Sequence, residues 1–134
     1  MSDKTSYPIE ALQTSLYALL SAIPINIYDE VPEGAALPYS TFGDMFDEPN
    51  EARGVKGRMV VVPINVYSKD SGGRFEAAGL MKQIIESVTA DALAIVGWQD
   101  CGKTYNGGKI ERMKKDSGYS YHGIVTFLIT VCKK

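Results

Sequence analysis

Hydrophobic residues recur along the chain at two different spacings, and the longer spacing predicts two helices. Across residues 8–23 the apolar side chains fall three or four positions apart, and Pro24 follows them. This spacing gathers them on one helical face, so we predict an amphipathic helix that ends at Pro24. Residues 75–88 repeat the pattern after the chain-breaking pair Gly72-Gly73, and they predict a second helix.

The shorter spacing, with apolar and polar residues alternating, predicts the strands. Two are short, a third has the clearest alternation, and the last two form a terminal hairpin. They cover residues 25–28, 39–46, 58–67, 109–115 and 119–132. Pro63 interrupts the third strand and lacks an N–H, which favours an edge or bulged position.

The predicted order of elements is α-β-β-β-α-β-β. Neighbouring strands without crossover helices between them imply a mostly antiparallel sheet, so we predict an α+β fold with two helices packed on that sheet. A length of 134 residues, with 45% hydrophobic and 22% charged residues, fits one domain over residues 1–134.

Two segments are predicted to be irregular. Residues 44–57 mix prolines and glycines with charged side chains, so we expect a long exposed loop that binding partners would order. Gly97–Thr104, which Gly107 and Gly108 follow closely, is expected to form a glycine-rich connection.

The apolar runs, the first residues and the cysteines of the chain argue against several classes of protein. No apolar run reaches the roughly 18 residues that span a bilayer, and the polar start Met1-Ser2-Asp3-Lys4 does not resemble a signal peptide, so we expect a soluble protein that is not secreted. Cys101 and Cys132 are too few and too far apart for a metal-ligand spacing or a disulfide framework. We therefore expect reduced thiols.

Charge is divided unevenly along the chain. Up to Trp98 there are 7 basic and 13 acidic residues, and from Gln99 onward there are 7 basic and 3 acidic ones. The basic third could be a solvated face, or it could dock against the acidic region of another copy. The candidate docking residues are Asp44, Asp47, Glu48, Arg53, Lys56, Lys114 and Lys115.

One segment fits the pattern of a phosphate-binding loop. Gly97–Thr104 reads GxxxxGK[ST], but that loop needs a helix to begin at its lysine, and Tyr105–Gly108 does not favour one. Asp100 would also place a carboxylate among the phosphate oxygens. A small nucleotide-binding or hydrolytic enzyme therefore stays an alternative function, not the predicted one.

No catalytic site is predicted elsewhere. His122 is the only histidine, and its place near a hairpin turn favours a surface or cross-strand role over catalysis. Three of the 8 tyrosines fall in the basic third, which leaves a nucleic-acid-binding module as a second alternative. We expect no catalytic residues, metal or cofactor.

Three short motifs carry a resemblance to a known family. They are Tyr28–Tyr39 (YDEVPEGAALPY), Ile64–Ser68 (INVYS) and Tyr121-His122-Gly123. Their order and spacing resemble small tail-completion proteins of long-tailed bacteriophages, which include tail terminators and tail-to-head joining proteins. Pro63 and the segment Gly102–Thr104 depart from the family's pattern.

The resemblance implies a structural virion protein and not an enzyme. Such proteins form a ring, generally of six copies, that caps the tail tube of a siphovirus and joins it to the head-tail connector. The implied partners are other copies of the chain, the tail tube protein and the connector protein, with no membrane and no small-molecule substrate. The implied location is the head-tail junction of the virion, after synthesis in the cytoplasm of the bacterial host.

Overall fold

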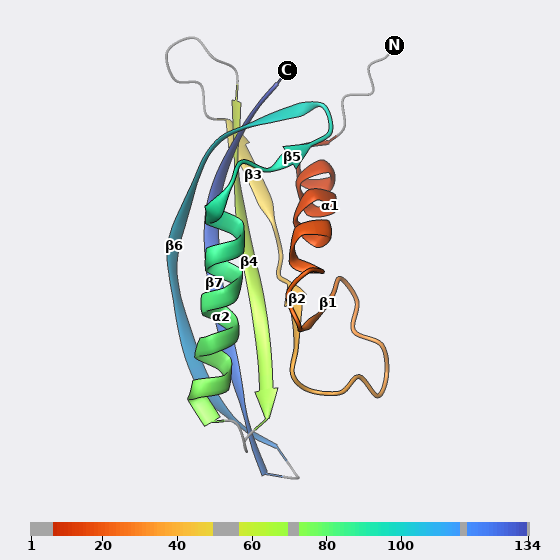
Figure 1. The fold of residues 1–134 in the computed structure, drawn as a ribbon, viewed down its shortest axis with the longest axis vertical. Coiled ribbons are helices and arrows are strands. Elements are labelled where there is room, and N and C mark those ends of the chain that lie inside the picture. The colour runs from red at the N-terminus through yellow and green to blue at the C-terminus, as the bar shows by residue number, and fades with distance from the viewer. Residues whose placement is uncertain (1–6, 50–56, 70–72, 116–117, 134) are drawn as a thin grey trace.

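The computed structural model describes residues 7–49, 57–69, 73–115 and 118–133, and these form two helices and a seven-stranded sheet (Figure 1). The elements are α1 (Pro8–Leu20), β1 (Asn26–Tyr28), β2 (Tyr39–Phe42), β3 (Phe46–Pro49), β4 (Gly57–Lys69), α2 (Gly73–Ala90), β5 (Ala94–Ile95), β6 (Trp98–Lys115) and β7 (Gly118–Lys133). The strand order is β1-β2-β4-β7-β6-β5, with β3 also on β4. Only β1 and β2 pair in parallel, so the predicted α+β class is confirmed.

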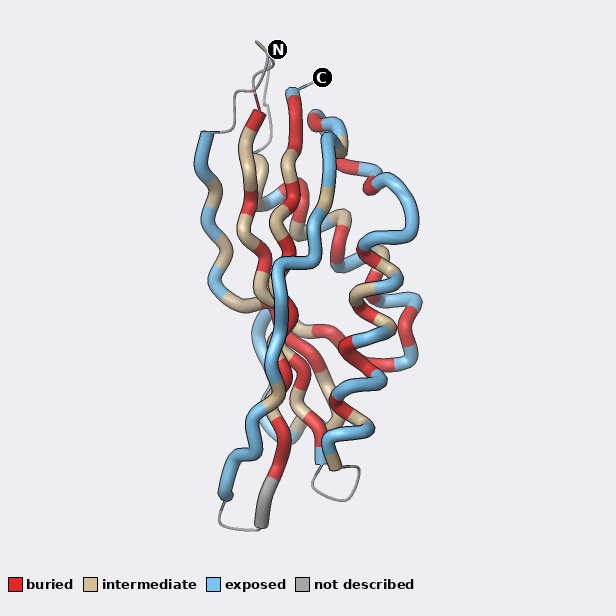
Figure 2. The backbone as a smooth tube through the Cα atoms, turned by 90° about the vertical axis from the view of Figure 1, so that its left-hand side faces the viewer, coloured by how far each residue is buried: buried red, intermediate tan, exposed pale blue. Residues whose placement is uncertain are grey.

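The core lies between the helices and one face of the sheet (Figure 2). Alternate residues of β4 and β7 are fully buried there, together with the apolar stripes of both helices. The fully buried residues include Leu12, Leu16, Leu20, Val60, Val62, Ile64, Val66, Val88, Val125, Phe127, Ile129 and Val131. The predicted periods therefore select the buried faces of α1, β4 and β7.

Both helices differ at one end from the prediction. Helix α1 stops at Leu20, and Ile23 is buried by the turn that follows, where its N–H donates to Leu20 O over 3.0 Å. Ala78 and Phe75 were both predicted to join the apolar stripe of α2, but both are exposed, and Phe75 is 92% exposed. Phe75 lies in the first turn of α2, where the stripe first reaches the core at Ala77.

Pro63 lies in a central strand, yet its missing N–H is tolerated because the neighbouring strand is broken beside it. The predicted single strand 39–46 is divided into β2, which reaches Ile64, and β3, which starts at Val61. Gly43 lies in the break, and its N–H donates to Pro63 O over 2.7 Å. Because the N–H and C=O of a strand residue point to the same side, the missing donor of Pro63 faces this break and not β7.

The two segments predicted to be irregular are partly regular. Residues 46–49 form β3 against β4, and residues 50–56 lie outside the described part of the chain. The expected glycine-rich connection at Gly97–Thr104 is wrong, because residues 98–108 form the first half of β6. Bulges between Asp100 and Lys103 and between Tyr105 and Gly108 absorb the extra residues, and Gly102 and Gly107 adopt positive φ there.

Gly108 allows β6 to lie close to β7. A Cβ atom at this position would lie 2.6 Å from Ile124 O and 2.9 Å from the Tyr105 hydroxyl. We predict that Gly108→Ala lowers the free energy of unfolding by about 1–3 kcal/mol, because a backbone oxygen cannot move aside as a side chain can. Urea unfolding measures the change.

Gly79→Ala is the matched control for this substitution. Gly79 lies within α2, and a Cβ there would meet nothing within 4 Å. Alanine should therefore stabilise the helix by roughly 0.5–1 kcal/mol. Equal effects of the two substitutions would contradict the packing at Gly108.

The expectation of reduced thiols is also wrong. Cys101 and Cys132 form a disulfide with their Cα atoms 6.0 Å apart, although 31 positions separate them in sequence. The first bulge of β6 places Cys101 beside the end of β7, and sequence spacing gave no sign of this register. The bond ties the C-terminal strand to its neighbour.

We predict that reduction with dithiothreitol lowers the melting temperature by about 10 °C, because a cross-link over a loop of this length restricts the unfolded chain. Differential scanning calorimetry with and without the reductant tests this. The variant Cys101→Ser with Cys132→Ser should melt at the lower temperature and should not respond to dithiothreitol. A wild-type protein insensitive to reductant would contradict the prediction.

Candidate docking surface

The sheet face opposite the helices is not covered by any element of the described chain. Residues of β4 and β7 that alternate with the buried ones point to it, and all are half-buried. They are Met59, Val61, Pro63, Asn65, Tyr67, His122, Ile124, Thr126, Leu128 and Thr130. We call this set the open face. Phe46 of β3 extends it and is 55% exposed.

Aromatic rings form a continuous row across four strands at one end of the open face. Ring centroids lie 5.7 Å apart for Tyr28 and Tyr39, 5.3 Å for Tyr39 and Tyr67, and 4.6 Å for Tyr67 and His122. The last two rings are stacked within 2° of parallel. Tyrosine suits surfaces that become buried on association, because its ring is apolar and its hydroxyl can still bind. We call these four residues the aromatic row.

His122 is held in place by a chain of polar contacts. Its Nε2 donates to Asn65 Oδ1 over 2.8 Å, and Asn65 Nδ2 donates to Thr41 Oγ1 over 3.3 Å. Burial lowers the pKa of His122, the neighbouring Glu111 raises it and Lys109 lowers it, with a net lowering. The ring is a cross-strand partner of Tyr67, which confirms the structural role predicted for it.

This arrangement predicts a pH dependence of stability. A pKa that is lower in the folded protein means that the unfolded chain binds more protons, so the contribution of His122 is complete above the unfolded pKa of about 6.5 and is lost as the pH falls below it. We expect the urea midpoint to decrease between pH 7.5 and 5.5. In His122→Gln, which cannot titrate, the same curve should be flatter. Parallel curves for the two proteins would show that His122 makes no such contribution.

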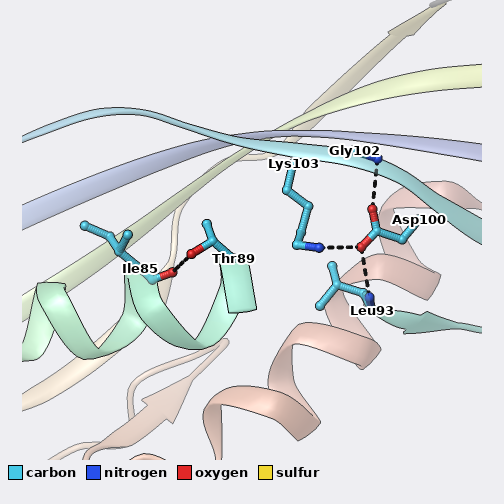
Figure 3. A network of polar contacts seen from close by, with 6 residues as sticks. All are labelled: Ile85, Thr89, Leu93, Asp100, Gly102 and Lys103. Atoms are coloured by element: carbon cyan, nitrogen blue, oxygen red, sulfur yellow. Dashed lines mark hydrogen bonds and ion pairs between the residues drawn. The ribbon is translucent and has the colours of Figure 1, made fainter. Parts of the chain in front are cut away.

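In the segment that fits the phosphate-loop pattern, the lysine is paired with a carboxylate of the same segment (Figure 3). Lys103 Nζ lies 2.6 Å from Asp100 Oδ2, and the Asp100 carboxylate also accepts the N–H groups of Leu93 and Gly102, each over 2.9 Å. Burial alone would raise the pKa of Asp100, but these bonds outweigh it and the pKa is lowered. Lys103 is thus neutralised within the protein.

No helix begins at that lysine, because residues 98–115 form β6. The backbone N–H groups of a helix start, which would hold a phosphate, are therefore missing from this segment. Asp100 instead fixes the first bulge of β6 to the connection that follows α2. The segment therefore matches the nucleotide-binding pattern in its sequence but not in its structure.

The acidic candidate docking residues lie on one edge of the sheet. Asp44 and Glu48 are exposed beside and within β3. Asp47 is not available in the same way, because its Oδ2 lies 2.7 Å from Arg58 Nε and its side chain is 12% exposed. It anchors β3 to β4.

Of the basic candidates, some lie on the opposite edge of the sheet, and the others lie outside the described residues. Lys114 is exposed on β6, and Lys115 is the last residue of that strand, with its side chain outside the described part. Arg53 and Lys56 lie outside the described residues. The candidates on β3 and β6 are therefore separated by the width of the sheet and do not form one site.

Opposite charge marks these two edges more broadly. Residues 24–49, which contain β1, β2 and β3, hold six acidic residues and no lysine or arginine. Residues 101–115, which contain most of β6, hold five basic residues and one acidic one. Sequence reasoning found the uneven charge, but the strand order was needed to show that the two groups occupy opposite edges.

Two negative findings apply to the described residues. No group of three or more histidine, cysteine, aspartate or glutamate side chains there could hold a metal ion. No helix in the same part of the chain is long and apolar enough to cross a membrane. The described chain presents an open face and two edges of opposite charge.

An uncovered sheet face and charged edges are features common among structural proteins. A model of the family described as "Tail completion protein gp17" matches residues 10–131. The chain belongs to this family and is a structural tail completion protein, not an enzyme. The resemblance seen in the sequence motifs is thereby confirmed.

A solved structure shows the same fold. A chain in a particle described as "Virion of native gene transfer agent (GTA) particle" aligns with a TM-score of 0.73 and 18% sequence identity. The alignment covers 94% of this chain and 99% of that chain. A comparison with curated proteins finds no match.

Proposed function

We propose that this chain completes the tail of a phage-like particle as a ring of copies, generally six, that joins the tail tube to the head-tail connector. The observation that carries the proposal is the family match over residues 10–131. The similar fold of a chain in the gene transfer agent particle supports it.

The surfaces of the chain suit a ring. A ring forms when one patch on each copy fits a different patch on the next copy and the rotation closes. The two sheet edges carry opposite charge, so they are different patches of one molecule that attract each other.

The open face gives the copies a further surface for other partners. It combines apolar side chains of β4 and β7 with the aromatic row, and no described element covers it. A ring that joins a tail tube to a connector needs contacts along its axis as well as around its circumference. Different surfaces for these contacts allow all of them to form at once.

Loss of the protein should separate the two halves of the particle. We predict that particles made without it accumulate as filled heads and separate tails, including tails of abnormal length, because both axial contacts are lost together. Electron microscopy of the lysate, with the wild-type gene supplied in trans as control, measures this. Joined particles of normal appearance in the deletion mutant would refute the proposed function.

Purified protein should restore joined particles in that lysate without added nucleotide. Joining preformed surfaces draws on association energy alone, and Lys103 is already paired with Asp100. Infectivity or gene transfer after nucleotide removal with apyrase measures the effect. A requirement for ATP would revive the enzymatic alternative based on Gly97–Thr104.

A further inference from the structure

We infer that neighbouring copies join through opposite edges of their sheets, with β6 over Lys109–Lys115 of one copy meeting the β1 and β3 edge of the next. This inference rests on the proposed function and identifies the surfaces that would build the ring. It also commits to one partner, a second copy of this chain.

The first support is the shape of β6. Its residues 108–115 pair with β7 in unbroken register, and on its other side β5 pairs with Trp98 and Gln99 alone. The regular stretch 109–115 therefore forms a sheet edge of the described chain (Figure 2). An exposed, regular edge presents backbone N–H and C=O groups to another strand.

The two halves of β6 differ in how well their edge can pair with another strand. Residues 98–108 contain both bulges and two glycines with positive φ, Gly102 and Gly107. Bulges twist an edge and hinder pairing with another chain, so that half is protected. Such protection is missing from residues 109–115, where the backbone is regular.

The opposite edge is formed by β1 and β3. Strand β1 pairs with β2, strand β3 pairs with β4, and no further strand of the described chain lies beyond either. Five acidic residues along or beside this edge are exposed. They are Asp29, Glu30, Glu33, Asp44 and Glu48.

Charges within the chain leave this complementarity largely intact. Among the described residues, Asp47 pairs with Arg58, and Lys109 pairs with Glu111 over 3.1 Å with both side chains more than half exposed. Asp44, Glu48 and Lys114 form no ion pair within that part of the chain. Their charges are therefore directed to solvent or to another molecule.

The charges also restrict which contacts can form. Two β6 edges repel each other because both are basic, and two β1/β3 edges repel because both are acidic. A symmetric dimer through like edges is disfavoured, and only the head-to-tail contact of unlike edges remains. Repetition of that contact generates a ring.

Backbone pairing and charge contribute differently to this contact. Exposed ion pairs are individually weak and are screened by salt, so they select the partner edge and speed its approach. Strand pairing between the copies, together with burial of neighbouring side chains, supplies the remaining affinity.

The basic edge could instead contact the phosphates of DNA. Two observations favour a second copy. Glu111 interrupts the basic residues at the middle of the stretch, and the complementary edge in the same chain has no lysine or arginine in residues 24–49. DNA binding is accordingly treated as an outcome of the test.

Zero-length cross-linking tests the contact directly. A carbodiimide joins a lysine amine to a carboxylate only when the two touch, so reconstituted wild-type particles should yield peptides that link Lys109 or Lys114 to an acidic residue of 24–49. Mixing ¹⁴N- and ¹⁵N-labelled protein before reconstitution shows whether the two peptides come from different copies. Particles without any such link between copies would overturn the inference.

Charge exchange provides an independent test. Variant A carries Lys109→Glu and Lys114→Glu, and variant B carries Asp44→Lys and Glu48→Lys. Each variant alone brings like charges together and should restore roughly 100-fold fewer particles than wild-type protein. An equal mixture should recover to within about 10-fold of wild type, because copies of A and B can alternate with every contact complementary.

Controls match the change in charge at other exposed positions. Lys82→Glu with Lys133→Glu is the control for A, and Glu86→Lys with Asp91→Lys is the control for B. Both controls should restore particles as wild-type protein does, and circular dichroism should show all four variants folded. Failure of the controls, full activity of A or B alone, or no recovery in the mixture would overturn the inference.

The outcome separates this inference from the proposed function. If the deletion mutant makes normal particles, the tail-completion role fails whatever the cross-links show. If A and B behave like wild type while the deletion mutant still lacks joined particles, the role stands and the edge contact fails. If A no longer shifts DNA in a gel, wild-type protein does, and the mixture of A and B does not recover, the basic edge contacts DNA instead.

Discussion

The long antiparallel pair of β4 and β7 is the interaction on which the rest of the structure depends. Thirteen residues of β4 pair in unbroken register with β7. Because side chains alternate, this register places one set of residues against the helices and the other set on the open face. A slip by one residue would exchange the two sets, burying Asn65 and His122 and exposing the valines of the core. Core and docking surface are therefore fixed by the same hydrogen bonds.

Irregularities elsewhere in the sheet adapt its neighbours to this central pair. The break at Gly43 accommodates Pro63, and the bulges of β6 allow a glycine-containing segment to follow β7. Gly123 contributes in the same way, since a Cβ there would lie 2.5 Å from Met81 Sδ of α2. Each of these residues permits a close approach that a larger side chain or an additional N–H would prevent.

The side chains that the sequence offered for catalysis or nucleotide binding are engaged within the fold. The only histidine is stacked and hydrogen-bonded, and the lysine of the phosphate-loop pattern is paired with Asp100. Charge remains at the sheet edges, and aromatic rings remain on the open face. Binding energy from such surfaces is gained only when copies or partners meet, which suits a protein that completes a larger particle.

The sequence by itself determined the α+β class, both helices, the core strands and the uneven charge, because these follow from the local spacing of apolar and charged residues. It did not give β3, the first half of β6 or the Cys101–Cys132 bond. Those features depend on pairing with β4 and β7. The residues of β7 that pair with Cys101 and its neighbours are distant from them along the chain. Only the tertiary structure decided that the acidic and basic segments lie at opposite edges and that Tyr28, Tyr39, Tyr67 and His122 share one row. Strand order and register bring these residues together, and no local pattern encodes either of them.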